Sequence, residues 1–377
     1  MNIGVPRETG RYERRAGLTP WAVEQLARIG HTVVVETNAG RGARFEDQEY
    51  LEGGATIVYS HDEAFQRADL VCGVNVLQGA DLEALRPESV LLGFHHLAVV
   101  PRPVVERLRD LRMTVIGYEL IADAEGHRYV LTPMSEMAGD MAVFTAAHYL
   151  QNENGGRGIL LGTVAGIAPP TVLILGAGTA GRSAAARALA VGAHVIVLDD
   201  SLAKLRVLRR RLGSGIVTQL ATQDRLARYT AIADVVIGAV LIPGGRAPYL
   251  VTESMVRAMR PGSVIVDVSI DQGGCVETSR PTTLHDPVFL AHDVVHYCVP
   301  NMTANVARTA SRAMSDAVLA PVSALAARGL PAALRADPGL AAGVYLYRGE
   351  LVNEKLAQTL GATATPLARA LEREAGL

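Results

Sequence analysis

The segment TVLILGAGTAGRSAAARALAVGAHVIVLDD, residues 171–200, constrains the fold of this chain more than any other stretch of its sequence. An apolar run over residues 171–175 leads directly into GAGTAG, and a second apolar run ends at Asp199. We expect a helix between the two runs, starting after Thr179. A strand, a helix and a second strand at this spacing predict a parallel pair within an α/β sheet.

The glycines of GAGTAG fill the three glycine positions of G-x-G-x-x-G, with Gly176 first, Gly178 second and Gly181 third. The first permits a tight turn, the second lets a pyrophosphate approach the backbone, and the third lets the helix pack on the strand. The backbone amides around Thr179 and Ala180, at the start of the helix, would face the anion. The pattern predicts a dinucleotide site, although glycine turns are common in this chain.

The second strand ends in an acid, Asp199, where a carboxylate can accept hydrogen bonds from both hydroxyls of a ribose. The same carboxylate would repel a 2′-phosphate, so the sequence favours NAD over NADP. Asp200 is a second candidate for this role. Lys204 can reach the adenosine edge of the cofactor, or it is simply a solvated charge on a helix.

Strands and helices alternate in two parts of the chain. The first 130 residues contain the strand-like runs MNIGVP, HTVVVETN, ADLVCGVNV, SVLLGFHHL and MTVIGYEL. A long helix is expected from Ser135 to Leu150, and a second series of strands follows in TVLILGAG, HVIVLDD, DVVIGAVL and SVIVDVS. From Ala304 onward the chain is helical in pattern, with no further strong strand. We therefore expect two parallel sheets joined by the helix near Ser135.

Composition excludes several classes of protein. With 36 Lys plus Arg against 38 Asp plus Glu, the net charge of −2 argues against nucleic acid as a main partner. No run of 18 apolar residues is present, and MNIGVPRE lacks the features of a signal peptide, so we expect a cytoplasmic protein. The three cysteines show no CxxC or Cys/His zinc spacing, so we expect free thiols and no metal.

Four side chains are candidates for chemistry beside a bound dinucleotide. Arg15, in ERRAGLTP, can bind a carboxylate through two hydrogen bonds, or it is a surface arginine. His95 and His96 would point to opposite faces of a strand, so at most one enters a given site; a structural histidine is the alternative. Asp271 follows the strand VIVDV at the carboxyl edge where α/β sheets bind ligands, although it could equally form a turn.

The chain resembles the alanine dehydrogenase family, which is related to the NAD-binding subunit of nicotinamide nucleotide transhydrogenase. The resemblance covers nearly the whole length, in GVPRE, RRAGLTP, FHHLA, LTPMSEMAG, GGRGILLG, GAGTAG, IGAVLIPGGRAP, VIVDVSIDQGGC, HYCVPNM and GELVNEKLAQTLG. It implies an α/β protein with two Rossmann-like, doubly wound parallel-sheet domains and a cleft between them. The expected substrate domain is 1–133 plus 305–377, the expected NAD domain is 134–304, and a homo-oligomer, often a hexamer, is expected.

The family reaction is the reversible oxidative deamination of L-alanine to pyruvate and ammonia with NAD. Carried over by resemblance, Arg15 would hold the substrate carboxylate and His96 would be the general acid/base. Asp271 would orient the water or ammonia and stabilise the charged intermediate. The NAD pocket would further include Ser135, Asp199, Leu241, Asn301 and Met302.

One position departs from the family pattern. The family has K-V-K-x-P after the strand near residue 70, and its second lysine contacts the substrate; here the stretch is GVNVL, with Asn75 at that position. No lysine occurs before Lys204. Three readings remain open. The chain is an NAD-dependent oxidoreductase of amino or imino acids with a preference other than alanine, a genuine L-alanine dehydrogenase, or a catalytically silent NAD-binding paralogue.

Overall fold

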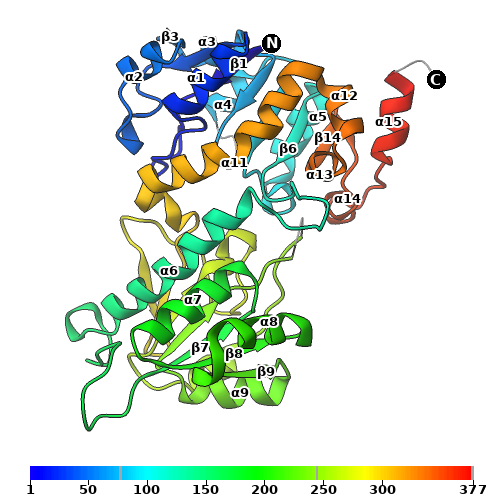
Figure 1. Ribbon diagram of the computed structural model, residues 1–377. Coiled ribbons are helices and arrows are strands. Elements are labelled where there is room, and N and C mark those ends of the chain that lie inside the picture. Colours follow the sequence, from blue (N-terminus) through cyan, green and yellow to red (C-terminus); the bar gives the residue numbers. More distant parts are fainter. Residues whose placement is uncertain (76–78, 243–244, 375–377) are drawn as a thin grey trace. The chain divides into compact units, whose positions relative to one another are not determined.

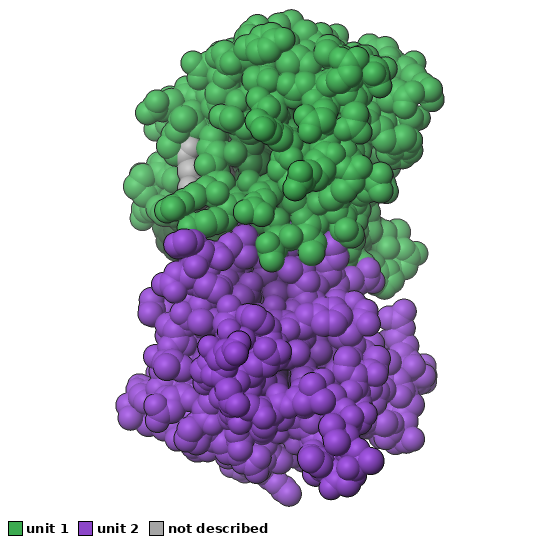
Figure 2. Space-filling view, turned by 90° about the vertical axis from the view of Figure 1, so that its left-hand side faces the viewer, with its two compact units in different colours: residues 1–134, 243–245, 304–377 green, residues 135–242, 246–303 purple. Residues whose placement is uncertain are grey.

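The strands of this protein form two separate sheets, one of eight strands and one of seven. The computed structural model describes residues 1–75, 79–242 and 245–374, shown in Figure 1. The chain divides into two compact units, coloured separately in Figure 2. Unit 1 is built mainly from Met1–Met134 and Ala304–Leu377, and unit 2 from Ser135–Ile242 and Arg246–Thr303. The two-sheet α/β prediction is confirmed.

The sheet of unit 1 has the order β15-β14-β6-β5-β4-β1-β2-β3. Its strands are β1 (Asn2–Val5), β2 (Thr32–Glu36), β3 (Thr56–Val58), β4 (Leu70–Cys72), β5 (Val90–Gly93), β6 (Thr114–Gly117), β14 (Val344–Tyr347) and β15 (Glu350–Leu351). The main helices are α1 (Pro20–Arg28), α2 (Asp47–Glu52), α3 (His61–Gln66), α4 (Ala80–Ala84), α5 (Arg102–Asp110), α11 (Ala307–Arg328), α12 (Leu330–Ala336), α13 (Pro338–Ala342), α14 (Glu354–Thr359) and α15 (Leu367–Glu374). Strands β1 to β6 pair in parallel.

The last part of the chain contains two strands that pair into the sheet of unit 1, so the expectation of no further strong strand after Ala304 is wrong. Strands β14 and β15 form a hairpin whose turn residues, Arg348 and Gly349, have φ of 45° and 82°. Strand β14 pairs antiparallel with β6 and extends the sheet begun by the first third of the chain. The short segment VYLY between Ala-rich helices gave too weak an alternation to be recognised in the sequence.

The sheet of unit 2 has the order β12-β13-β11-β10-β7-β8-β9, with only β12 antiparallel. Its strands are β7 (Thr171–Leu175), β8 (His194–Asp199), β9 (Ile216–Leu220), β10 (Val235–Gly238), β11 (Val264–Asp267), β12 (Val288–Ala291) and β13 (Val294–Tyr297). Helices α6 (Leu131–Tyr149), α7 (Thr179–Ala190), α8 (Leu202–Leu212), α9 (Gln223–Ile232) and α10 (Glu253–Arg257) accompany them. Helix α6 begins four residues earlier than expected, because Pro133 is tolerated in a first turn.

Both faces of the unit 2 sheet are buried, as strand β7 illustrates. Val172 and Ile174 pack in one core cluster with residues of α6 and α7, whereas Leu173 and Leu175 pack in another with residues of α9 and α10. Successive side chains of a strand point to opposite faces, so a continuous apolar run indicates helices on both sides. This is the doubly wound arrangement that the sequence predicted.

In unit 1 a histidine joins three elements through its two ring nitrogens. The Nδ1 atom of His61, the first residue of α3, lies 2.7 Å from Oε2 of Glu36 at the end of β2, and its Nε2 lies 2.9 Å from Oδ1 of Asp81 in α4. Thr9 Oγ1 also donates a hydrogen bond to Asp81. The hydrogen bonds to Asp81 and Glu36 raise the pKa of His61 to about 9. At neutral pH the His61 imidazolium therefore links α3 to β2 and to α4, through Glu36 and Asp81. We call this arrangement the His61 clamp.

We expect His61→Gln to destabilise the protein in a pH-dependent way. The folded pKa of His61 lies above the unfolded value of 6.5, so its contribution is fully present below pH 6.5 and is lost as the pH rises through about 9. At pH 6 the variant should lose about 1.5–3 kcal/mol, as for other charged hydrogen bonds. Urea unfolding at pH 6 and pH 10 measures the difference, with the exposed His127→Gln as control; an equal loss at both pH values would contradict the clamp.

Candidate functional site

The candidate substrate residues of unit 1 follow neighbouring parallel strands. Strands β6, β5, β4 and β1 are consecutive in the sheet, so their carboxyl ends lie at one edge. Arg15 lies in the segment after β1, Asn75 lies three residues beyond β4, and His96 lies three residues beyond β5. The topology therefore gathers these three predicted residues at the same edge of one sheet.

A buried carboxylate links two of them. Arg15 donates from Nε to Oε1 of Glu13 over 2.8 Å and from Nη2 to Oε2 over 2.6 Å, and both side chains are only 2% exposed. Asn75 donates from Nδ2 to Oε2 of the same Glu13 over 3.0 Å. Two parallel hydrogen bonds of this kind are the strongest geometry between a guanidinium and a carboxylate. The sequence analysis missed Glu13, because a glutamate among arginines in a turn reads as a solvated charge.

A second glutamate that the sequence analysis missed holds the backbone around Asn75. Glu8 accepts a hydrogen bond from the amide of Val74 over 2.6 Å, and another from the amide of Asn75 over 3.3 Å. Burial and the nearby Glu13 raise the pKa of Glu8 to about 8. At neutral pH the Glu8 side chain is therefore mostly protonated, and the charges of Glu13 and Arg15 balance one another.

The two adjacent histidines occupy different environments. The opposite-face argument assumed that His95 and His96 both lie on a strand. Strand β5 ends at Gly93, so both histidines lie beyond it. His95 is 1% exposed, and burial lowers its pKa to about 4, which suits a structural role. His96 has a left-handed backbone with φ of 43°, and its side chain is 13% exposed.

Glu119, two residues beyond β6, fixes the backbone of His96. The amide of His96 donates to Glu119 Oε1 over 2.7 Å, and the hydroxyl of Tyr345 donates to the same oxygen over 2.7 Å. The Nδ1 atom of His96 lies 3.9 Å from that oxygen. Tyr345 comes from the hairpin at the far end of the chain, so the strand that the sequence analysis missed also contributes to this environment.

In unit 2 the three glycines of GAGTAG have different structural reasons. Gly176 has φ of 101°, and a Cβ there would lie 2.5 Å from the carbonyl oxygen of Ala239. A Cβ on Gly181 would lie 1.8 Å from the oxygen of Gly176, so these two glycines serve the fold itself. A Cβ on Gly178 would meet nothing within 4 Å. The open space is therefore at Gly178, directly before Thr179, where α7 begins.

The helix α7 that follows the glycine turn also packs closely on α6. A Cβ on Gly139 of α6 would lie 2.2 Å from the oxygen of Ala180, and Figure 1 shows the two helices side by side. Ser135, one turn before Gly139, is therefore held on the same unit as the glycine turn. Thr179 accepts a hydrogen bond from Arg182 through its hydroxyl over 3.3 Å.

Asp199 connects the end of β8 to the glycine turn. Its Oδ2 accepts a hydrogen bond from the amide of Ala177 over 2.6 Å, and its Oδ1 accepts one from the amide of Ser201 over 2.7 Å. The ammonium of Lys204 lies 3.8 Å from Oδ2. Because a carboxylate has about four acceptor sites, the side chain can accept further hydrogen bonds from a ribose.

The remaining predicted residues of unit 2 follow β10, β11 and β13. The amide of Asn301 donates to Oδ1 of Asp271 over 2.8 Å, so the structure brings these two together. Leu241 is 40% exposed, and the residues on either side of it are hydrogen-bonded to Ser269 and Gln272. Met302, in contrast, is 4% exposed and packs in the core of the unit.

One set of side chains among the described residues could hold a metal ion. Asp123, Glu125 and His127 place a ligand atom each within 4.8 Å of one another, but all three are exposed. Asp123 already accepts hydrogen bonds from the backbone amides of Glu125 and His127, as expected of a turn. The hydrogen bonds account for the cluster without an ion.

Comparison with known proteins identifies relatives that cover nearly the whole chain. Family models described as alanine dehydrogenase/PNT, N-terminal and C-terminal domain, match residues 4–138 and 142–354. Alanine dehydrogenase of Mycobacterium tuberculosis (strain ATCC 25618 / H37Rv) is 42% identical over 98% of this chain and all of the relative, and that of Halomonas elongata is 41% identical over 96% and 97%.

Solved structures extend the similarity to the fold. An L-alanine dehydrogenase structure matches with a TM-score of 0.88 and 41% identity, covering 96% of this chain and 99% of its own. A transhydrogenase from Sinorhizobium meliloti matches with a TM-score of 0.77 and 25% identity, covering 93% and 100%. Both family models and full-length relatives thus confirm the predicted family: the chain belongs to the alanine dehydrogenase/PNT family.

Proposed function

We propose that this protein is an NAD(H)-dependent oxidoreductase that acts on the CH–NH2 or C=N group of an amino or imino acid. One observation carries the proposal. Arg15, whose guanidinium pairs with the Glu13 carboxylate, and the partly exposed imidazole of His96 follow nearby strands of unit 1, in a chain whose unit 2 has a dinucleotide-type glycine turn. Full-length similarity to proteins named alanine dehydrogenase supports the same class of reaction.

The residues of unit 2 suit NAD. The open space at Gly178 and the first amides of α7, at Thr179 and Ala180, would accept the pyrophosphate, and Asp199 would bind the ribose with Lys204 beside it. In this proposal Ser135, Leu241, Asn301 and Met302 complete the pocket, Met302 through its backbone because its side chain is buried. NAD supplies a hydride acceptor, and NADH a hydride donor.

In unit 1, Arg15 and His96 would handle the substrate. Arg15 would bind its carboxylate, and His96 would move the proton at the reacting nitrogen or oxygen near neutral pH. Glu119 would keep His96 in position through the backbone. Asp271, held by the amide of Asn301, would stabilise the cationic carbinolamine or iminium of the substrate.

The charges around Asn75 support a preference other than alanine and pyruvate. Asn75 brings no positive charge, and the charge of Arg15 is already balanced by buried Glu13. A missing charged hydrogen bond is worth ~1.5–3 kcal/mol, so pyruvate turnover should be lower by roughly tenfold to a few hundredfold. A genuine L-alanine dehydrogenase is the second candidate, favoured by 42% identity to a protein of that name.

We also propose a cytoplasmic homo-oligomer that acts on small molecules. The oligomer is expected from the resemblance to the family alone, and the near-balanced charge supports the absence of a nucleic-acid partner. Among the described residues, no helix is long and apolar enough to cross a bilayer.

The proposal is tested by following NADH oxidation with ammonia or simple amines against a panel of 2-oxo acids. We expect activity on larger or differently charged oxo acids or on imines, and only weak activity on pyruvate. Full activity on pyruvate would establish the alanine dehydrogenase instead. Tight NAD binding without turnover of any compound would identify a silent paralogue.

Asn75→Lys should increase the activity on pyruvate. A lysine here would place a positive charge beside Glu13 and Glu8, and would add a charged partner for the substrate. We expect kcat/KM for pyruvate to rise by roughly tenfold or more, for the same ~1.5–3 kcal/mol. Asn152→Lys, an exposed position on unit 2, is the control, and an equal rise there would count against the role of residue 75.

Gly178→Ala should weaken NAD binding without loss of stability. Its backbone, with φ of −69° and ψ of −168°, suits alanine, and the added methyl group meets no protein atom within 4 Å. Fluorescence titration with NADH and thermal unfolding measure the two effects. Gly162→Ala should change neither, whereas Gly181→Ala should unfold at lower temperature because its Cβ meets the oxygen of Gly176. Unchanged NADH affinity in Gly178→Ala would refute the pyrophosphate position.

A further inference from the structure

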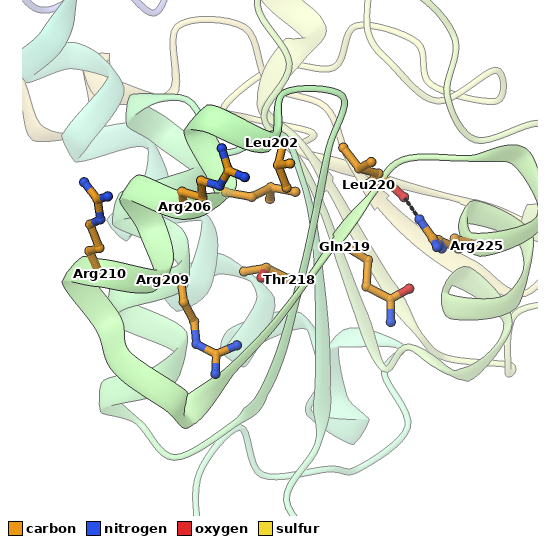
Figure 3. Close-up of a pocket in the computed structure, with 9 residues that line it drawn as sticks. Leu202, Arg206, Arg209, Arg210, Thr218, Gln219, Leu220 and Arg225 are labelled. Atoms are coloured by element: carbon orange, nitrogen blue, oxygen red, sulfur yellow. Dashed lines mark hydrogen bonds between the residues drawn. The ribbon is translucent and has the colours of Figure 1, made fainter.

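Unit 2 contains a solvent-open hollow of about 490 Å³ between helix α8 and the edge strand β9. Figure 3 shows its lining, with Arg206, Arg209 and Arg210 on α8 and Arg225, at the start of α9, hydrogen-bonded to the carbonyl oxygen of Leu220. Its residues are Leu202, Leu205, Arg206, Arg209, Arg210, Thr218, Gln219, Leu220 and Arg225, with no acid among them. We propose that this hollow binds a nucleoside di- or triphosphate at a site separate from the glycine turn.

The first reason is that the cationic side chains in the hollow have no ion-pair partners. Within the described ranges, none of Arg206, Arg209, Arg210 and Arg225 takes part in an ion pair, and α8 contains no acidic residue. Other exposed helical arginines do pair with a glutamate four residues away, as in Arg67–Glu63, Arg102–Glu106 and Arg257–Glu253. What distinguishes the hollow is that four arginines gather there with no acid in the lining. An unbalanced group of guanidinium charges attracts an anion.

The helix dipole explains only part of this group. Arg209 and Arg210 lie in the last turn of α8, where a positive charge is favourable. Arg206 lies in the middle of the helix, three and four residues before them, where like charges repel. Arg225 lies in the first turn of α9, where the dipole disfavours a cation. Local helix stability therefore gives no reason for Arg206 to be here, whereas Arg225 is held by a hydrogen bond from Nη1 to the carbonyl oxygen of Leu220 over 2.9 Å.

The other residues of the lining favour a ligand that has an apolar part as well as a negative charge. Leu202 and Leu220 are 48% and 38% exposed, which leaves an apolar surface beside the guanidinium groups. Thr218 and Gln219 add hydrogen-bonding groups on the strand side. Guanidinium forks match the oxygens of phosphate, and the volume lies within the usual range for small ligands. In a bound nucleotide, the phosphates would contact the arginines and the flat base would pack on the two leucines.

The hollow is distinct from the glycine turn but ends near it. In the parallel register of β8 and β9, Leu220 lies opposite Asp199, whereas Arg209 and Arg210 lie at the other end of α8. A nucleotide could therefore bind to the proposed NAD site instead, and the experiment has to separate the two. Gly178→Ala, at the glycine turn, and substitutions on α8 provide that separation.

The test is calorimetric titration of the full-length protein with ATP, tripolyphosphate and adenosine at one fixed ionic strength. Arg206→Gln/Arg209→Gln should weaken ATP binding at least about tenfold, since two charged contacts are removed. The control, Arg211→Gln/Arg228→Gln, removes two arginines of the same helices that do not line the hollow, and should change the affinity less than about twofold. Saturating NAD should leave ATP bound.

Several outcomes would overturn the site. Equal losses in both double variants would mean that ATP binds through the general charge of the unit. Displacement of ATP by NAD, together with weaker ATP binding in Gly178→Ala, would assign ATP to the NAD site. Tripolyphosphate binding as tightly as ATP would remove the role of the leucines, and a short RNA binding more tightly than ATP would replace a small ligand with a nucleic acid.

Discussion

Parallel pairing of neighbouring strands is the constraint on which both proposed sites depend. Because every crossover returns the chain to the same end of the sheet, the carboxyl ends of the central strands lie together in each unit. In unit 1 this edge collects the segments with Glu8, Arg15, Asn75, His96 and Glu119 from four strands. In unit 2 the corresponding edge collects the glycine turn, Asp199 and the loop of Asp271. Residues more than sixty positions apart in sequence, such as Glu8 and Asn75, thereby become neighbours.

Within the unit 1 group, burial decides which charges can exist. Glu13 and Arg15 form a buried ion pair whose two short hydrogen bonds offset the cost of burying the two charges. Glu8 has no such cation to itself, so burial and Glu13 keep it mostly protonated. A change of side chain at position 75 therefore affects more than one contact, since Asn75 is hydrogen-bonded to both Glu13 and Glu8.

The fold was largely readable from the sequence, and the charge environment was not. Continuous apolar runs such as residues 171–175 predict strands buried on both faces. The three glycines and Asp199 predicted the turn between β7 and α7. The hairpin around Arg348 escaped notice because its strands are short and lie among Ala-rich helices. Glu13 and Glu119 were also not predicted. The role of each carboxylate depends on the fold, which buries it beside Arg15 or His96. The roles of the site residues remain predictions that the proposed experiments address.

The hairpin of β14 and β15 determines the order in which this protein can be completed during its synthesis. Unit 2 is formed largely by one uninterrupted stretch, so it can fold as soon as that stretch leaves the ribosome. Strand β6 of unit 1, in contrast, has to wait for more than two hundred further residues before β14 covers its edge. Until then an open strand edge is available to other nascent chains. The late arrival of β14 therefore lengthens the interval in which unit 1 is open to aggregation through that edge.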